Sequence, residues 1–117
     1  QGKYYSGRHY LFFRQLATKN LGAAWETYPG RALALWGRAD FVSTEADHAL
    51  IAEIVNRAHP GNGKFIAMEG IDHGLDKAES QSAAHAKLGQ PGTFNPSIVS
   101  TLRAWADETT GKTSKTE

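Results

Sequence analysis

The chain has no cysteine among its 117 residues, which excludes a disulfide framework and thiolate chemistry. It also lacks any apolar run near the ~20 residues that a membrane-spanning helix needs, and its N-terminus does not have the pattern of a signal peptide. The formal net charge is only +1. The sequence therefore gives no electrostatic reason to expect nucleic acid, a membrane surface or a polyanionic substrate as a partner. The length and composition are those of one modest domain and do not indicate a function, whereas the motifs do.

The clearest pattern lies between residues 31 and 75 and predicts a strand, a helix and a second strand. The first strand, Arg31 to Gly37, is a continuous apolar run of the kind found in parallel sheets that are covered on both faces. A helix over Thr44 to Ala58 has acids in its first turn and one apolar face. The second strand is Lys64 to Gly70. Strands joined by a crossover helix pair in parallel, so the predicted fold class is α/β.

One acid and one histidine lie just past the two strand ends. Asp40 follows the first strand and His73 follows the second. Because neighbouring parallel strands end at the same edge of a sheet, the two side chains are expected within hydrogen-bonding reach, at the edge where open α/β sheets bind ligands. Such a pair is two-thirds of a catalytic triad, in which the carboxylate orients the imidazole and stabilises its protonated form. Two alternatives stay open: Asp40 as a simple Asx-turn residue, and Asp72 as the functional acid.

The segment WGRADFVS, followed by MEGIDHG, resembles the C-terminal part of an α/β-hydrolase. The resemblance implies that Asp40 is the triad acid and His73 the triad base, acting on an ester, thioester or related acyl bond. It also implies a single partial domain over 1–117, with parallel strands, a crossover helix, C-terminal helices and an incomplete sheet. Residues 1–29 would be a helical segment returning from the lid. Dehalogenase, C–C hydrolase and peptidase variants share this layout.

The nucleophile of that family is missing from this chain. The family carries it in a Gly-x-Ser-x-Gly turn between a strand and a helix, and none of the serines at 6, 43, 80, 82, 97, 100 and 114 has these flanking glycines. The chain alone is therefore expected to be inactive. A nucleophile-bearing N-terminal part, from the same precursor or from a second chain, is the expected partner, and a small acyl compound the expected substrate. The alternative is a non-catalytic, hydrolase-derived module used for packing or assembly.

Outside this unit the sequence predicts helices over 9–19, 21–28 and 76–88. The N-terminal aromatic side chains are expected either to make packing contacts or to line an acyl or leaving-group pocket; those considered for the pocket are Tyr4, Tyr5, Tyr10, Phe12 and Phe13.

A last helix is expected to begin with Asn95 as its cap and Pro96 at its first position. Its apolar residues are expected to face inward; they are Ile98, Val99, Leu102 and Trp105. The polar residues 109–117 are expected to fray.

No cofactor motif is present, because the glycines at 61 and 63 precede a strand rather than a helix. Asp40, Asp72, His73 and Asp76 are residue types that bind metals, but no paired spacing supports a metal site. His48 and His59 are expected at the surface.

Overall fold

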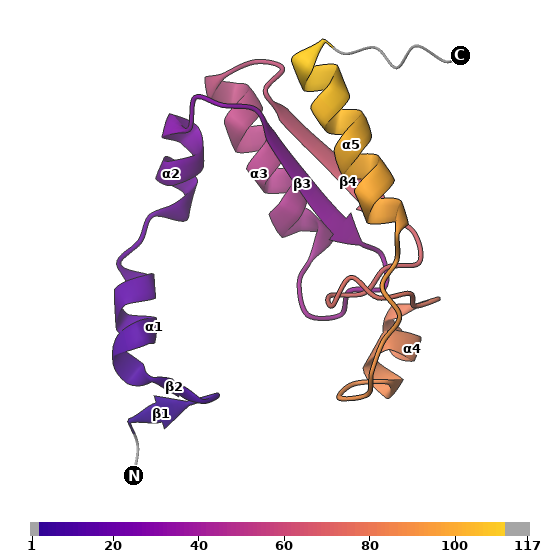
Figure 1. Ribbon diagram of the computed structural model, residues 1–117. Coiled ribbons are helices and arrows are strands. Elements are labelled where there is room, and N and C mark those ends of the chain that lie inside the picture. The colour runs from indigo at the N-terminus through magenta and orange to yellow at the C-terminus, as the bar shows by residue number, and fades with distance from the viewer. Residues whose placement is uncertain (1–2, 112–117) are drawn as a thin grey trace, which may run out of the picture.

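The computed structural model describes residues 3–111 as a mixed α/β arrangement (Figure 1). The elements in chain order are β1 (Tyr4–Tyr5), β2 (Arg8–His9), α1 (Tyr10–Ala17), α2 (Leu21–Thr27), β3 (Ala32–Gly37), α3 (Glu45–Ala58), β4 (Gly63–Met68), α4 (Gln81–Ala86) and α5 (Ser97–Thr110).

The centre of the fold is the parallel pair β3 and β4, joined by the crossover helix α3. The register runs from Ala32 opposite Gly63 to Gly37 opposite Met68, so both strands end at one edge. The parallel pairing and the crossover helix are as predicted from the sequence. In residues 3–111 this sheet has two strands, and the other sheet is the short antiparallel pair β1 and β2.

Helix α3 covers one face of the parallel pair. Ala32, Ala34 and Trp36 of β3 alternate as its buried residues, and Val55 of α3 is fully buried. The helix approaches closely at Gly63, where a Cβ atom would collide with a backbone carbonyl of α3. A separate buried apolar cluster in the described residues consists of Ala39, Ala78 and Ala84, with Phe41 packed against it.

The opposite face is covered less completely than the sequence predicted. Helix α5 runs along β4 (Figure 1), and Lys64 Nζ lies 2.8 Å from Glu108 Oε2. The alternate residues Leu33 and Leu35 of β3 are only half-buried. The continuous apolar run thus indicated burial on both faces, but within the described chain only one face is well covered.

The prediction for the apolar residues of the last helix is partly wrong. Ile98 is buried and Trp105 half-buried, whereas Val99 is 54% and Leu102 44% exposed. The reason is that the parallel sheet beside α5 has only two strands within residues 3–111, so one side of the helix has no sheet to pack against. The helix begins at Ser97, one residue later than predicted, and Pro96 rather than Asn95 is at its N-cap position. The Asn95 side chain still accepts a hydrogen bond from the first turn, since the Ser97 N–H donates to its Oδ1 at 3.1 Å.

The N-terminal segment lies away from the sheet (Figure 1). Helix α1 has no buried residue, and Tyr4 and Tyr5 are 72% and 74% exposed. The aromatic rings contact one another instead, as Tyr5 and Phe13 do with centroids 5.8 Å apart. The predicted packing contacts therefore exist between the rings themselves, and none of the residues of α1 is buried in a core. The radius of gyration, 17.3 Å, exceeds the roughly 13 Å of a compact domain of similar length.

The predicted helix over 76–88 is reduced to α4, Gln81–Ala86. Asp76 and Lys77 instead form isolated bridges with Phe94 and Ile71, because the chain folds back on itself after the histidine loop. In the predicted fraying tail, residues 109 and 110 belong to α5, which ends at Gly111 with a φ of 67°. The rest of that tail, 112–117, lies outside the described residues. Within 3–111, no helix combines the length and the apolar character needed to cross a membrane.

Candidate functional site

The loops after β3 and β4 are held together by a close backbone approach. Gly37 ends β3, and a Cβ at this position would collide with the backbone carbonyl of Ile71. The same carbonyl accepts a hydrogen bond from the N–H of Ala39 at 3.0 Å. Only glycine allows this approach, which brings the segment before Asp40 against the segment before His73.

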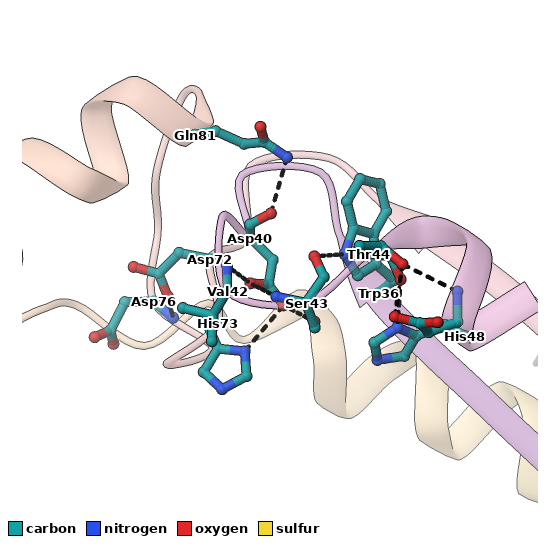
Figure 2. A network of polar contacts seen from close by, with 11 residues as sticks. Trp36, Asp40, Val42, Ser43, Thr44, His48, Asp72, His73, Asp76 and Gln81 are labelled. Atoms are coloured by element: carbon teal, nitrogen blue, oxygen red, sulfur yellow. Dashed lines mark hydrogen bonds and ion pairs between the residues drawn. The ribbon is translucent and has the colours of Figure 1, made fainter. Parts of the chain in front are cut away.

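Both oxygens of the Asp40 carboxylate accept hydrogen bonds (Figure 2). Oδ1 accepts from the backbone N–H groups of Val42 at 2.7 Å and Ser43 at 3.0 Å. Oδ2 accepts from the Ser43 hydroxyl and lies 3.0 Å from Nδ1 of His73. Asp40 is only 4% exposed. The sequence-predicted acid and histidine are thus in contact, and the acid also forms the turn considered as its structural alternative.

The surroundings of Asp40 act on its pKa in opposite directions. Burial raises the pKa, since it disfavours the charged form. The hydrogen bonds from the Ser43 hydroxyl and N–H, from His73 and from the Val42 N–H lower it, and together they outweigh burial. The pKa of Asp40 is therefore held well below its usual range, and the group is a carboxylate at neutral pH.

His73 is the exposed member of the pair. Its side chain is 55% exposed, against 6% for that of Asp40. With Nδ1 directed at the carboxylate, the neutral ring carries its proton on Nδ1 and leaves a lone pair on Nε2. In the described part of the chain Nε2 has no hydrogen-bond partner. The ring can therefore take a proton from a group approaching on its open side.

Two further side chains hold the acid loop in place. The indole Nε1–H of Trp36 donates to the Ser43 carbonyl at 3.2 Å. The Gln81 amide, at the start of α4, donates to the backbone carbonyl of Asp40 at 2.8 Å. Neither contact was predicted from the sequence. The Asp-x-x-Ser spacing is a recognisable turn signal that could have drawn attention to Ser43, whereas nothing in the sequence connects Gln81 to a loop 41 residues earlier.

The rival acid, Asp72, does not contact the imidazole. Its Oδ1 accepts a hydrogen bond from the backbone N–H of Asp76 at 2.9 Å, which closes the tight turn that carries His73. Asp40 and His73 are in contact, but residues 3–111 contain no group of three acidic or histidine side chains arranged to hold a metal ion. Asp72 therefore shapes the loop rather than orienting the ring.

The other two histidines considered in the sequence lie elsewhere. The imidazole of His48 contacts the carbonyl of Thr44 at 2.8 Å, one turn earlier in α3. His59 ends α3 at the opposite end of the sheet from His73. Both are half-buried rather than fully exposed.

A cleft of about 510 Å³ adjoins His73. Its apolar lining comes from the loop after Asp40 and from the segment around and after α4, namely Phe41, Val42, Ala84, Leu88 and Pro91. Asp72, Asp76, Lys77 and Lys87 also line it. The volume lies within the ~300–1,000 Å³ range of small-molecule sites. None of the N-terminal aromatic residues considered as pocket residues lines this cleft.

Comparison with known proteins gives no match to a family model, to a curated protein or to a solved structure. The interpretation of the site therefore depends on its geometry and on the sequence motifs.

Proposed function

We propose that this chain is the C-terminal part of a serine-type α/β-hydrolase and supplies the acid and the histidine of its catalytic triad. The observation that supports the proposal is the 3.0 Å contact between Asp40 Oδ2 and His73 Nδ1. The contact joins a buried, ionised acid to an accessible imidazole, at the carboxyl ends of adjacent parallel strands. Each of these properties is needed for a triad, and an Asx-turn alone requires neither the histidine nor its exposure.

In this proposal the roles follow from the two nitrogens of the imidazole. Nε2 takes the proton of the nucleophilic hydroxyl as the acyl bond is attacked, and then gives it to the leaving group. Asp40 keeps the ring in the Nδ1–H tautomer and stabilises the positive charge that develops on it. The cleft beside His73 is a suitable place for part of a small ester or thioester.

The nucleophile comes from another segment. Ser43 is the serine of this chain in contact with the pair, but its hydroxyl donates to the Asp40 carboxylate and not to the imidazole. A hydroxyl held in this way cannot pass its proton to His73. The proposed partner is a nucleophile-bearing N-terminal part of the hydrolase, in the same precursor or in a second chain.

The test combines native mass spectrometry with a fluorophosphonate probe. The purified protein should contain a segment or a second chain that carries Gly-x-Ser-x-Gly and reacts with the probe. In that complete protein, His73→Ala and Asp40→Asn should lower kcat for p-nitrophenyl esters by about 10²–10⁴-fold, since general acid–base catalysis contributes that much. His59→Ala is the matched control, because it removes a histidine at the other end of the sheet. Near-normal hydrolysis by His73→Ala would refute the proposal.

A second candidate is a non-catalytic module used for assembly. The observation in its favour is the exposed apolar surface, on α1 and on Val99 and Leu102 of α5. Such surfaces are unusual on an isolated soluble domain and mark interaction sites. If the protein is found in a stable assembly without any probe-reactive serine, and His73→Ala leaves that assembly intact, this second function is the correct one.

A further inference from the structure

The Asp40 carboxylate accepts a hydrogen bond from the Ser43 hydroxyl, which has no role in the proposed triad. The Ser43 hydroxyl donates to Oδ2, the same oxygen that contacts His73. The Ser43 N–H donates to Oδ1 at 3.0 Å. One residue therefore binds both oxygens, from three positions further along the chain.

Ser43 is itself fixed from the other side. Its backbone carbonyl accepts the 3.2 Å hydrogen bond from the indole of Trp36, and Trp36 is a buried residue of β3. The hydroxyl is thus tied to the sheet rather than carried by a free loop. Figure 2 shows the sequence of contacts from the indole, through Ser43, to the carboxylate and the imidazole.

We infer that Ser43 is a positioning residue, whose hydroxyl fixes the rotation of the Asp40 carboxylate so that a lone pair of Oδ2 is directed at Nδ1 of His73. The backbone N–H groups of Val42 and Ser43 both donate to Oδ1. These two bonds hold Oδ1 in place but do not fix the position of Oδ2. The hydroxyl bound to Oδ2 fixes that position. It occupies one acceptor position of Oδ2 and leaves the other to the imidazole, since a carboxylate oxygen has two such positions.

The hydroxyl has a second effect, on the charge of the acid. Burial raises the pKa of Asp40, and the Ser43 hydroxyl is foremost among the hydrogen bonds that lower it. A carboxylate that stayed neutral would lose its attraction for a protonated imidazole. Ser43 thereby favours both the orientation and the ionised state that a triad acid needs, so its catalytic importance rests on the proposed function.

The test reads the imidazole directly and needs no turnover. In the ¹⁵N-labelled chain, at a pH where His73 is neutral, its two nitrogen chemical shifts give the populations of the Nδ1–H and Nε2–H tautomers. We expect the Nδ1–H form to dominate. Ser43→Ala should lower the ratio of the two tautomers by about three- to tenfold, the usual worth of one hydrogen bond. Ser43→Thr, which keeps the hydroxyl, should restore the ratio. Ser100→Ala, on the exposed side of α5, is the control and should leave it unchanged.

A companion measurement follows the carboxyl ¹³C signal of Asp40 in acid. Removing the hydroxyl should raise the proton affinity of Asp40 about tenfold, because a hydrogen bond to a charged group is lost. If Ser43→Ala does not fold, Ser43→Cys is the alternative, since the thiol has a similar shape but is a weak donor.

The inference is overturned if a folded Ser43→Ala or Ser43→Cys protein keeps the tautomer ratio and the acid titration of the unaltered chain. It is also overturned if Ser43→Thr folds but fails to restore the ratio. Failure of the hydrolase proposal gives a different result, in which the Ser43 variants change the His73 signals as expected while the complete protein shows no hydrolysis that depends on His73.

Discussion

Asp40→Asn should change how the stability of the chain depends on pH. Burial raises the folded-state pKa of Asp40, but hydrogen bonds from Ser43, His73 and Val42 outweigh this effect and hold the pKa below its ordinary value. The unfolded chain therefore binds a proton at Asp40 at a higher pH than the folded chain does. The resulting stabilisation is fully present above the unfolded pKa of about 3.9. It is lost as the pH falls towards the folded value.

The magnitude follows from proton linkage. Between the two pKa values one proton separates the folded and unfolded states, so the free energy of unfolding falls by about 1.4 kcal/mol for each pH unit. From pH 5 to pH 2 the unaltered chain should lose about 2 kcal/mol of stability that the Asp40→Asn variant, whose side-chain amide does not titrate, cannot lose. Because Asp40 is only 4% exposed, added salt should hardly reduce this difference.

Urea unfolding of both proteins, at several pH values between 2 and 7, measures the effect. The pKa of Glu108 is also lowered, by the hydrogen bond and the charge of Lys64. That pair is half-exposed, so its contribution should shrink in high salt while that of Asp40 persists. The reasoning is refuted if, in high salt, Asp40→Asn and the unaltered chain lose stability in parallel as the pH falls.

Three further substitutions test the supports of the fold and the site. Gly37→Ala should destabilise the chain by about 1–3 kcal/mol in urea unfolding and shift the His73 NMR signals, because its Cβ collides with the histidine loop; an unchanged midpoint would contradict the close approach. Gln81→Ala removes the bond to the Asp40 carbonyl and should cost about 1 kcal/mol in the same assay, whereas Ser82→Ala should have little effect. Asn56→Ala breaks a reciprocal pair of 2.8 Å bonds with the Gly63 backbone and should cost about 2 kcal/mol, with Arg57→Ala as the milder control.

The strand–helix–strand unit could be predicted because its signals are local. The apolar runs and the acids of the first helical turn act within a few residues of the elements they define. The helix predicted over Thr44 to Ala58 occupies Glu45–Ala58, with Thr44 as its N-cap. The contact between Asp40 and His73 followed from the geometry of parallel strands, without any knowledge of the tertiary packing. The prediction of a helix over 76–88 was wrong at its start, because Asp76 and Lys77 form bridges to residues outside that segment. Asp76 pairs with Phe94, and Lys77 pairs with Ile71 across a turn.

The burial predictions were wrong where they assumed packing neighbours that the described part of the chain does not contain. Leu102 and Val99 have the spacing of a core-facing stripe, and an amphipathic pattern states which residues are apolar, not what they will touch. In this structure they are exposed. Gln81 was missed for the related reason that a contact between residues 41 positions apart has no sequence signature.

The acid–histidine pair is in contact although one face of the parallel sheet is poorly covered, because its supports are local. Everything that orients Asp40 and His73 lies within β3, β4, the loops that follow them and α4: the glycine contact at Gly37, the Asp40 turn and the Gln81 bond. None of these contacts involves Leu33 or Leu35, which are half-buried. The geometry of the pair is therefore set by local contacts. The stability of the sheet, in contrast, would increase if its exposed apolar surface were buried. A partner that covers this surface should raise the free energy of unfolding without altering the tautomer of His73. A pair that forms only when the partner binds would instead change its tautomer on binding.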